Sequence, residues 1–307
     1  KWTRVNGPDD KGIYNLMDQL TATGPFANKT LLDQAGIQMP AKGASWDDWA
    51  KAATAVAKAT KTPYPMAMDR SGHRFAGPAI SYGAKYFDAK GNPITVDDGF
   101  KAFAEQFVKW NQDGTMAKEV WAGSGGSAYQ DAAKEFINGS LVFYFSGSWQ
   151  IARIGKDVGD AFDWVATPEP CGSAGCTGIP GGAGVVGFKS TKHPEEVAKV
   201  LDFMAQKDVQ AKFMAATKNI PANKELQEAG VDYANATAAE KAALKQFTGD
   251  LQGFSPVAFQ FQGYKNNRAI MNSTVTRLTQ AIVGESNLDE ALGRIDSDVK
   301  QAVAESR

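Results

Sequence analysis

The chain alternates between amphipathic segments with helical spacing and short apolar runs bounded by turn residues. Apolar side chains recur on one face of residues 46–57 and of residues 97–112, so both segments are predicted to be helices. The unbroken apolar run 141–145 is typical of a strand that is buried on both faces. Short strands are also predicted at 64–68, 162–166 and 185–188, and further helices at 128–137, 191–206, 208–218, 265–283 and 288–306.

Two helix starts carry residues suited to capping them. Asn28 can cap a helix that stops at Gly36, and Ser45 can cap the helix that follows. Because strands alternate with helices, the pattern indicates an α/β chain with a mainly parallel sheet. Strands are few for 307 residues, and a missing N-terminal segment that carries several strands would explain this shortage. Residues 1–8 have neither an initiator Met nor a targeting pattern, so they look like the middle of a protein.

The composition changes between residues 167 and 184, which are dense in Pro, Gly and Cys and form the best candidate for a domain boundary. A second candidate lies at 253–256. Cys171 and Cys176 are separated by four small residues, two of them Gly, so the chain can fold back and close a small disulfide loop. Such a bond persists in an oxidising compartment. The alternative is a pair of free thiols in a flexible loop.

Charge and cysteine content exclude several classes of function. Lys and Arg number 33 and Asp and Glu 34, which gives a net charge of -1. This balance argues against broad nucleic-acid binding or binding to anionic membranes. With only two His and two Cys, a His-rich or thiolate metal site has little material, and no cofactor is expected. No apolar run is long enough to span a bilayer.

Catalytic motifs are weak. His193 precedes a proline at a helix start, which is typical of a surface cap, and Ser148 lacks the second glycine of a nucleophile elbow. The glycine run 181–184 leads into a strand and is not a phosphate-binding loop. Carboxylate pairs lie near helix starts, where they complement the helix dipole. A glycosidase with two carboxylates flanking a bond is therefore a minor alternative.

Aromatic side chains beside turns offer a better candidate site. Trp149 follows the buried strand 141–145 at a strand-to-helix turn, and ligands of open α/β sheets bind outside the carboxyl ends of strands. An indole ring can stack on the apolar face of a pyranose. Trp121, beside the glycine-rich loop 123–127, is a second candidate. His73 lies in a polar connection beside Arg70 and Arg74 and is either a ligand donor or a surface histidine.

Several segments, in this order along the chain, resemble motifs of the extracellular (periplasmic) solute-binding proteins of ABC sugar importers, family 1 type. Each motif is weak alone, and their shared order makes the resemblance strong. The matching segments are 26–37 (FANKTLLDQAGI), Pro40 with 45–49 (SWDDW), 136–149 (FINGSLV through GSW), 180–186 (PGGAGVV), 194–203 (PEEVA through F) and 219–221 (NIP).

The resemblance implies a helix-rich α/β fold with two lobes, a cleft between them, and a first lobe that is incomplete in this chain. Residues 23–168 and 254–307 would form the second lobe, 169–253 part of the first lobe, and 1–22 a crossover or remnant of the first. By similarity, Trp149 is the stacking platform and the protein is not an enzyme. The other expected ligand-binding residues are Arg74, His73, Trp121, Tyr129, Gly181, Gly182, Asp69 and Arg70.

The resemblance also implies partners and a compartment. The ligand would be a small sugar, delivered by hinge closure to the transmembrane permease subunits of an ABC transporter. The protein would be a periplasmic or cell-surface monomer that meets the membrane only through the permease or a lost lipid anchor. The alternative ligand is a phosphorylated polyol or another small polar solute, because Arg70 and Arg74 could serve a phosphate.

Overall fold

The computed structural model describes residues 15–123 and 125–306. Its centre is a six-stranded mixed sheet built around the long strand β1 (Leu16–Asn28). β1 pairs antiparallel with four strands: β3 (Leu141–Gly147), β4 (Trp164–Ala166), β7 (Pro180–Val185) and β8 (Ile220–Pro221). Only β2 (Tyr64–Met68) pairs parallel, with β3, among the described strands of this sheet. The prediction of a mainly parallel sheet is therefore wrong.

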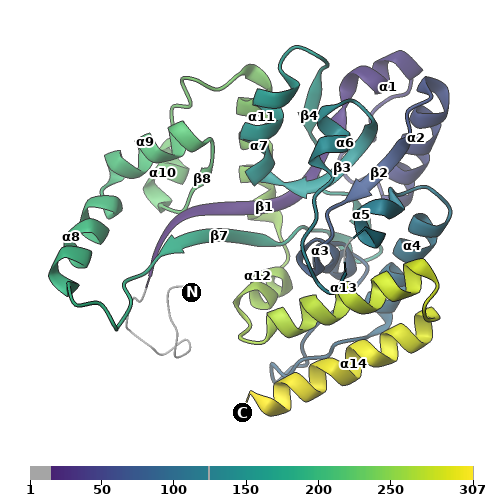
Figure 1. Cartoon of the computed structure of the whole chain (residues 1–307). Helices are drawn as coiled ribbons and strands as arrows, with labels where there is room; N and C mark the ends of the chain where they lie inside the picture. Colours follow the sequence, from purple (N-terminus) through teal and green to yellow (C-terminus); the bar gives the residue numbers. More distant parts are fainter. Residues whose placement is uncertain (1–14, 124, 307) are drawn as a thin grey trace.

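β1 extends through both lobes of the molecule (Figure 1). Its N-terminal half, from Leu16 to Ala22, pairs with β7, and its C-terminal half, from Thr23 to Asn28, pairs with β3 and β4. The sequence did not predict this strand, because 16–28 shows neither an apolar run nor a regular alternation of apolar and polar residues. The result is a two-lobed, helix-rich α/β fold, as the resemblance implied.

The larger lobe holds the main core. Trp46 and Trp49 are 1% and 3% exposed and pack against Phe143 and its neighbours, so the predicted apolar helix face is confirmed. The helices of this lobe are α1 (Lys29–Ala35), α2 (Trp46–Thr60), α3 (Gly72–Ser81), α4 (Asp98–Gln112), α5 (Lys118–Ala122), α6 (Ala133–Ile137), η1 (Ser148–Gln150), α7 (Ile151–Val158), α11 (Ala238–Gly253), α12 (Pro256–Gly263), α13 (Asn267–Val283) and α14 (Leu288–Glu305).

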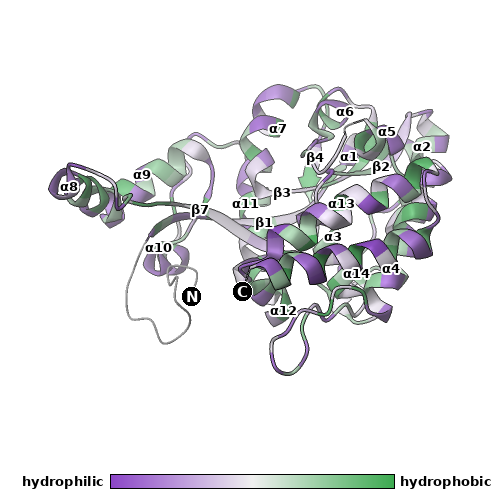
Figure 2. Cartoon of the chain, turned by 60° about the horizontal axis from the view of Figure 1, so that its bottom comes forward, coloured by the Kyte–Doolittle hydropathy of each residue, from purple (hydrophilic) through white to green (hydrophobic). Residues whose placement is uncertain are grey.

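The smaller lobe consists of the outer ends of β1 and β7 with β8, α8 (Pro194–Ala205), α9 (Lys207–Thr217) and α10 (Lys224–Ala229). No residue of α8 is buried. Hydrophobic residues lie along α8 and α9 (Figure 2), and Phe188 and Phe203 are 74% and 57% exposed. The apolar side chains of α8 thus have little cover within the described chain, whereas Met214 and Ile220 of the same lobe are fully buried.

The two lobes divide the sequence differently from the expected boundaries at 169 and 253. The hairpin of β5 (Cys171–Gly172) and β6 (Gly175–Cys176) packs on the larger lobe, where the Ala174 N–H donates to the Ser81 carbonyl. α11 also packs there, against β1, β4 and α7. Besides the crossing of β1 after Ala22, the chain therefore passes between the lobes near 180 and 237. The predicted disulfide between Cys171 and Cys176 is confirmed.

The predicted caps are also confirmed. Asn28 accepts a hydrogen bond from the Leu31 N–H, and Ser45 forms a reciprocal capping box with Asp48. Two predictions are wrong in extent: the helix expected at 128–137 covers only 133–137, and the strand expected at 185–188 lies at 180–185. Within the described chain, no helix has the length and apolar character needed to cross a bilayer.

Candidate functional site

Trp149 lies where the sequence placed it, at the turn from β3 into α7. The Ser148 hydroxyl accepts a hydrogen bond from the Ala22 N–H at 3.1 Å, which ties this turn to β1 where β1 passes between the lobes. Gly147 makes room for the indole, because a Cβ at that position would lie 2.1 Å from the Trp149 ring. The ring folds back over the strand end and stays half-buried.

One face of Trp149 is stacked with Arg74 of α3. The guanidinium carbon lies 4.0 Å from the centroid of the Trp149 ring and 5.8 Å from that of Tyr129. Arg74 is 8% exposed, so the cation–π contact is partly shielded from solvent. Two residues that are 75 positions apart in the sequence therefore form one aromatic and cationic surface.

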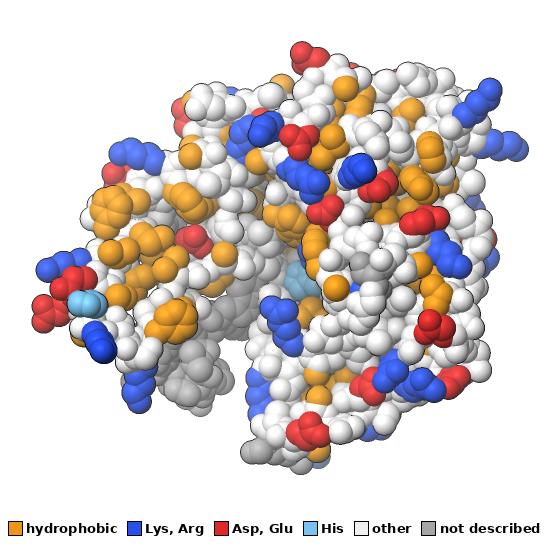
Figure 3. All heavy atoms as spheres, viewed as in Figure 1, with side chains coloured by type: hydrophobic (Ala, Val, Ile, Leu, Met, Phe, Trp, Pro, Cys, Tyr) orange, Lys and Arg blue, Asp and Glu red, His pale blue; other side chains and the backbone are white. Residues whose placement is uncertain are grey.

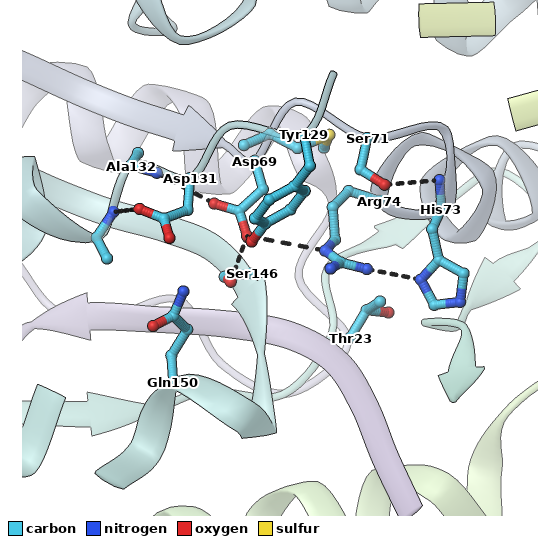
Figure 4. Close-up of polar contacts among 12 residues, drawn as sticks. Thr23, Asp69, Ser71, His73, Arg74, Tyr129, Asp131, Ala132, Ser146 and Gln150 are labelled. Carbon is cyan, nitrogen blue, oxygen red and sulfur yellow. Dashed lines mark hydrogen bonds and ion pairs between the residues drawn. The ribbon is translucent and has the colours of Figure 1, made fainter. Parts of the chain in front are cut away.

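Asp69 directly follows β2 and contacts both Tyr129 and Arg74 of this surface from the protein interior. It is fully buried and accepts hydrogen bonds from the Tyr129 hydroxyl at 2.8 Å, from Ser146 Oγ at 2.5 Å and from the Ala132 N–H at 3.2 Å (Figure 4). It also accepts a hydrogen bond from the Tyr144 hydroxyl at 2.8 Å. Burial raises the pKa of Asp69, while Arg74 and the hydroxyl donors lower it. Arg74 Nε lies 3.8 Å from its carboxylate. Asp69 thus fixes its neighbours from within the protein.

His73 lies beside Arg74 on the same helix. Its Nδ1 is 2.6 Å from Arg74 Nη1, and its Nε2 is 2.8 Å from Gln262 Oε1 on α12. Burial, with the neighbouring Arg74, lowers the pKa of His73 to about 3. A Cβ on Gly181 would lie 3.8 Å from the His73 ring, so β7 borders this cluster. His73, Arg74, Tyr129, Trp149 and Gly181 are therefore brought together.

Arg70 and Trp121 do not present surfaces to a ligand, which corrects the expectation for both. Arg70 is fully buried and donates to the backbone carbonyls of Trp121, Gly126 and Ala128. Trp121 is 1% exposed, its indole N–H donates to the Met68 carbonyl, and its ring packs on Phe107. Trp121, which was expected to present a flat ring beside the glycine-rich loop, is a core residue. Its indole N–H can be buried because the last residue of β2 supplies a backbone acceptor.

Gly182 lies within a pair of strands, whereas the Tyr129 ring is exposed to solvent. Gly182 faces the Gln19 carbonyl of β1, where a Cβ would approach to 2.3 Å, so its lack of a side chain serves strand pairing. Tyr129 is 50% exposed while its hydroxyl is fixed by Asp69. The ring is therefore both accessible and oriented. The molecular surface is hollowed between the smaller and larger lobes (Figure 3).

Sequence reasoning missed the supporting residues. Gln262, Tyr144 and Ser146 come from helix or strand positions whose pattern indicates only packing. No local signal pairs Gln262 with His73, which is 189 positions away. Over residues 15–123 and 125–306, no three His, Cys, Asp or Glu side chains are grouped as a metal site requires.

Comparison with known proteins supplies the family. A model of the family described as bacterial extracellular solute-binding protein matches residues 4–211. BAB2_0491, a binding protein of Brucella abortus (strain 2308), is 28% identical over 236 residues, which are 73% of this chain and 54% of that protein. A binding protein of Brucella suis biovar 1 (strain 1330) matches to the same extent. The chain thus spans about half the length of the curated relatives it matches.

Solved structures share the fold at low sequence identity. The substrate-binding protein Lmo0181 of Listeria monocytogenes, in complex with cycloalternan, has a TM-score of 0.77 at 19% identity, over 97% of this chain and 73% of that one. The GacH receptor of Streptomyces glaucescens, studied with acarbose, has a TM-score of 0.78 at 18% identity, over 97% and 72%. A solute-binding protein of Agrobacterium vitis with bound D-mannitol has a TM-score of 0.77 at 17% identity, over 98% and 75%.

Proposed function

The chain belongs to the family of bacterial extracellular solute-binding proteins, and on that premise we propose that it binds a carbohydrate in the hollow between its lobes. Trp149 is the stacking platform of this site, and Arg74 and Tyr129 line it. The bound sugar draws the lobes together, and the closed form delivers it to the permease subunits of an ABC transporter.

The observation that carries the proposal is the half-buried indole of Trp149 at the crossing between the lobes. The Cζ3–Cη2 edge of its ring lies against Gly147 and the Arg74 guanidinium stacks on one face, so the opposite face is the one proposed for the ligand. A pyranose stacks on such a ring through its C–H groups, while its hydroxyls seek charged donors and acceptors at the rim. The fold neighbours that hold cycloalternan and D-mannitol support a ligand rich in hydroxyls.

Two alternatives have different site requirements. A phosphorylated polyol needs more than one cationic donor or a helix N-terminus, and Arg70 is committed to backbone carbonyls. A glycosidase needs two carboxyl groups at the scissile bond, whereas Asp69 already accepts four hydrogen bonds in the interior. Both arrangements favour a neutral sugar that is bound without being altered.

Titration calorimetry with a ligand panel tests the proposal. The panel holds maltose, acarbose, cycloalternan and D-mannitol, with glycerol 3-phosphate as the probe for the phosphorylated class. We expect one of the neutral compounds to bind and to raise the melting temperature, because a ligand of the native state stabilises it. Tight binding of glycerol 3-phosphate alone would favour the alternative ligand, and hydrolysis of an aryl glycoside would favour the enzyme.

Trp149→Ala should weaken binding of that ligand by about 1–3 kcal/mol, which is a stacking contact plus its buried area. Phe213→Ala is the matched control, because Phe213 is an aromatic residue of α9 that is 44% exposed. The Phe213→Ala variant should bind the ligand with the same affinity as the unmodified protein. An unchanged affinity in Trp149→Ala would remove Trp149 from the site.

A further inference from the structure

Gln262 reaches the site from α12, an element that supplies none of the residues expected to contact a ligand. We infer that Gln262 is a positioning residue: it accepts from Nε2 of His73 and holds the imidazole, whose tautomer Arg74 sets, so that His73 in turn holds the Arg74 guanidinium against Trp149. The effect on ligand affinity rests on the proposed function, whereas the tautomer itself belongs to the protein without ligand.

The donor and acceptor inventory determines the tautomer. Arg74 Nη1 can only donate, so His73 Nδ1, 2.6 Å away, must accept and carry no proton. The ring proton of neutral His73 is then on Nε2, which donates to Gln262 Oε1 at 2.8 Å. The opposite orientation of the Gln262 amide would place its NH₂ against this N–H, so the carboxamide oxygen must face the ring.

The surroundings keep His73 neutral. Burial and the positive charge of Arg74 lower the pKa of His73 to about 3, and hydrogen bonds with Gln262 and the Pro180 backbone only partly oppose this. The Asp69 carboxylate lies beyond Arg74, next to its Nε. α12 and β7 contribute the Gln262 amide and the Pro180 carbonyl, which are both uncharged. His73 therefore remains an acceptor for Arg74 at neutral pH.

This chain of contacts sets the place of the guanidinium. Arg74 Nε lies 3.8 Å from Asp69 and has no hydrogen-bond partner in the described structure. The short contact with His73 is thus the hydrogen bond that directs the guanidinium over the Trp149 ring, at 4.0 Å. A doubly protonated His73 would present a second N–H and a positive charge to Arg74 and would push it away from Trp149.

Nitrogen-15 NMR of the imidazole rings tests the tautomer without a ligand. The chain has only two histidines, so His193→Asn leaves the His73 signals alone in the spectrum. We expect the Nε2–H tautomer, with no titration between pH 5 and 8. An Nδ1–H tautomer, or a titration midpoint near the ordinary 6.5, would overturn the inference whether or not any sugar binds.

Gln262→Glu tests the consequence for binding. A carboxylate beside Nε2 should raise the pKa of His73, so the affinity for the panel ligand should fall about tenfold as the pH drops from 8 to 5.5. The unmodified protein should show a flat profile. His73→Asn in the Gln262→Glu background keeps an acceptor near Arg74 and should abolish the pH dependence.

Gln262→Met separates positioning from packing, because it preserves length and removes the acceptor. We expect weaker binding at every pH, while the NMR spectrum keeps the Nε2–H tautomer that Arg74 sets and shows a shifted Nε2 signal because its acceptor is gone. A Gln262→Glu profile that stays flat while its His73 ring titrates would overturn the link from His73 to Arg74. If the unmodified protein binds no compound of the panel, the proposed function fails, while the NMR result still decides the tautomer.

Discussion

Glu169 is a buried acid whose removal should stabilise the protein. It lies between β4 and the disulfide hairpin, is 6% exposed, and neither carboxyl oxygen has a hydrogen-bond partner in the described chain. Its Oε1 is so close to the backbone that a Cβ on Gly178 would lie 2.2 Å away. Burial raises the pKa of Glu169 well above its usual value, and Asp250 adds to the shift. Burial also raises the pKa of Asp250 to about 6.

The sign of the pH dependence follows from these shifts. An acid with a higher pKa in the folded state than in the unfolded state binds more protons when folded, so stability falls as the pH rises between the two values. For Asp250 this range runs from 3.8 to about 6, and for Glu169 it begins at 4.5 and extends upward. A hydrogen bond from Arg277 lowers the pKa of Asp298. Asp298 therefore changes the stability of the protein only as the pH falls through and below its usual pKa of 3.8.

Glu169→Met keeps the length of the side chain and removes the orphaned carboxyl. An unsatisfied buried polar group costs about 1–3 kcal/mol, so the variant should be more stable by that amount at pH 8. Each kcal/mol corresponds to roughly 1.5 °C in melting temperature for a chain of 307 residues. The gain should be smaller at pH 4.5, where folded Glu169 is protonated and its unfolded counterpart is about half protonated, so that mainly the cost of the unpaired neutral carboxyl remains.

Urea unfolding followed by circular dichroism at several pH values between 4.5 and 8.5 measures this difference. Glu285→Met, at an exposed position between α13 and α14, is the matched control and should change stability little at any pH. A Glu169→Met variant that is less stable than the parent throughout, or whose gain is the same at pH 4.5 and 8, would refute the reasoning.

Two further substitutions test the support of the site. Gly147→Ala should displace the Trp149 ring, because the new Cβ would lie 2.1 Å from it and 2.5 Å from the Ala22 carbonyl; we expect at least a tenfold loss of ligand affinity by calorimetry, and an unchanged affinity would contradict the ring placement. Asp69→Asn replaces the common acceptor of four donors and should lower the free energy of unfolding by about 3 kcal/mol in urea. Tyr129→Phe is its control and should cost about 1 kcal/mol, so equal losses in both would argue against Asp69 as the hub.

Local features were predictable because they depend on local chemistry. The Asn28 cap and the Ser45 capping box need only the next few residues, and the apolar face that contains Trp46 follows from helical periodicity. The disulfide between Cys171 and Cys176 closes within a short, glycine-containing loop. The position of Trp149 at a strand-to-helix turn follows from the same local reasoning.

Features that depend on distant partners were not predictable. Trp121 looks like a surface aromatic until the Met68 carbonyl, 53 positions away, accepts its N–H. The predicted sheet direction was wrong because β1, which the sequence did not predict, inserts between the consecutive strands β3 and β4 and runs antiparallel to both. Arg70 and Arg74 are close in sequence, yet one meets backbone carbonyls and the other an indole ring. The sequence pattern does not indicate the direction in which each of these side chains points.

A strand of thirteen residues at about 3.3 Å each is about 40 Å long. This length lets β1 take part in the sheet of both lobes. Its hydrogen bonds to β7 and β8 serve one lobe, and those to β3 and β4 serve the other. Unfolding of either lobe therefore removes hydrogen-bond partners from one half of β1, the strand that also belongs to the other lobe. We therefore expect the unfolding of the two lobes to be coupled through β1, despite the two-part shape of the molecule.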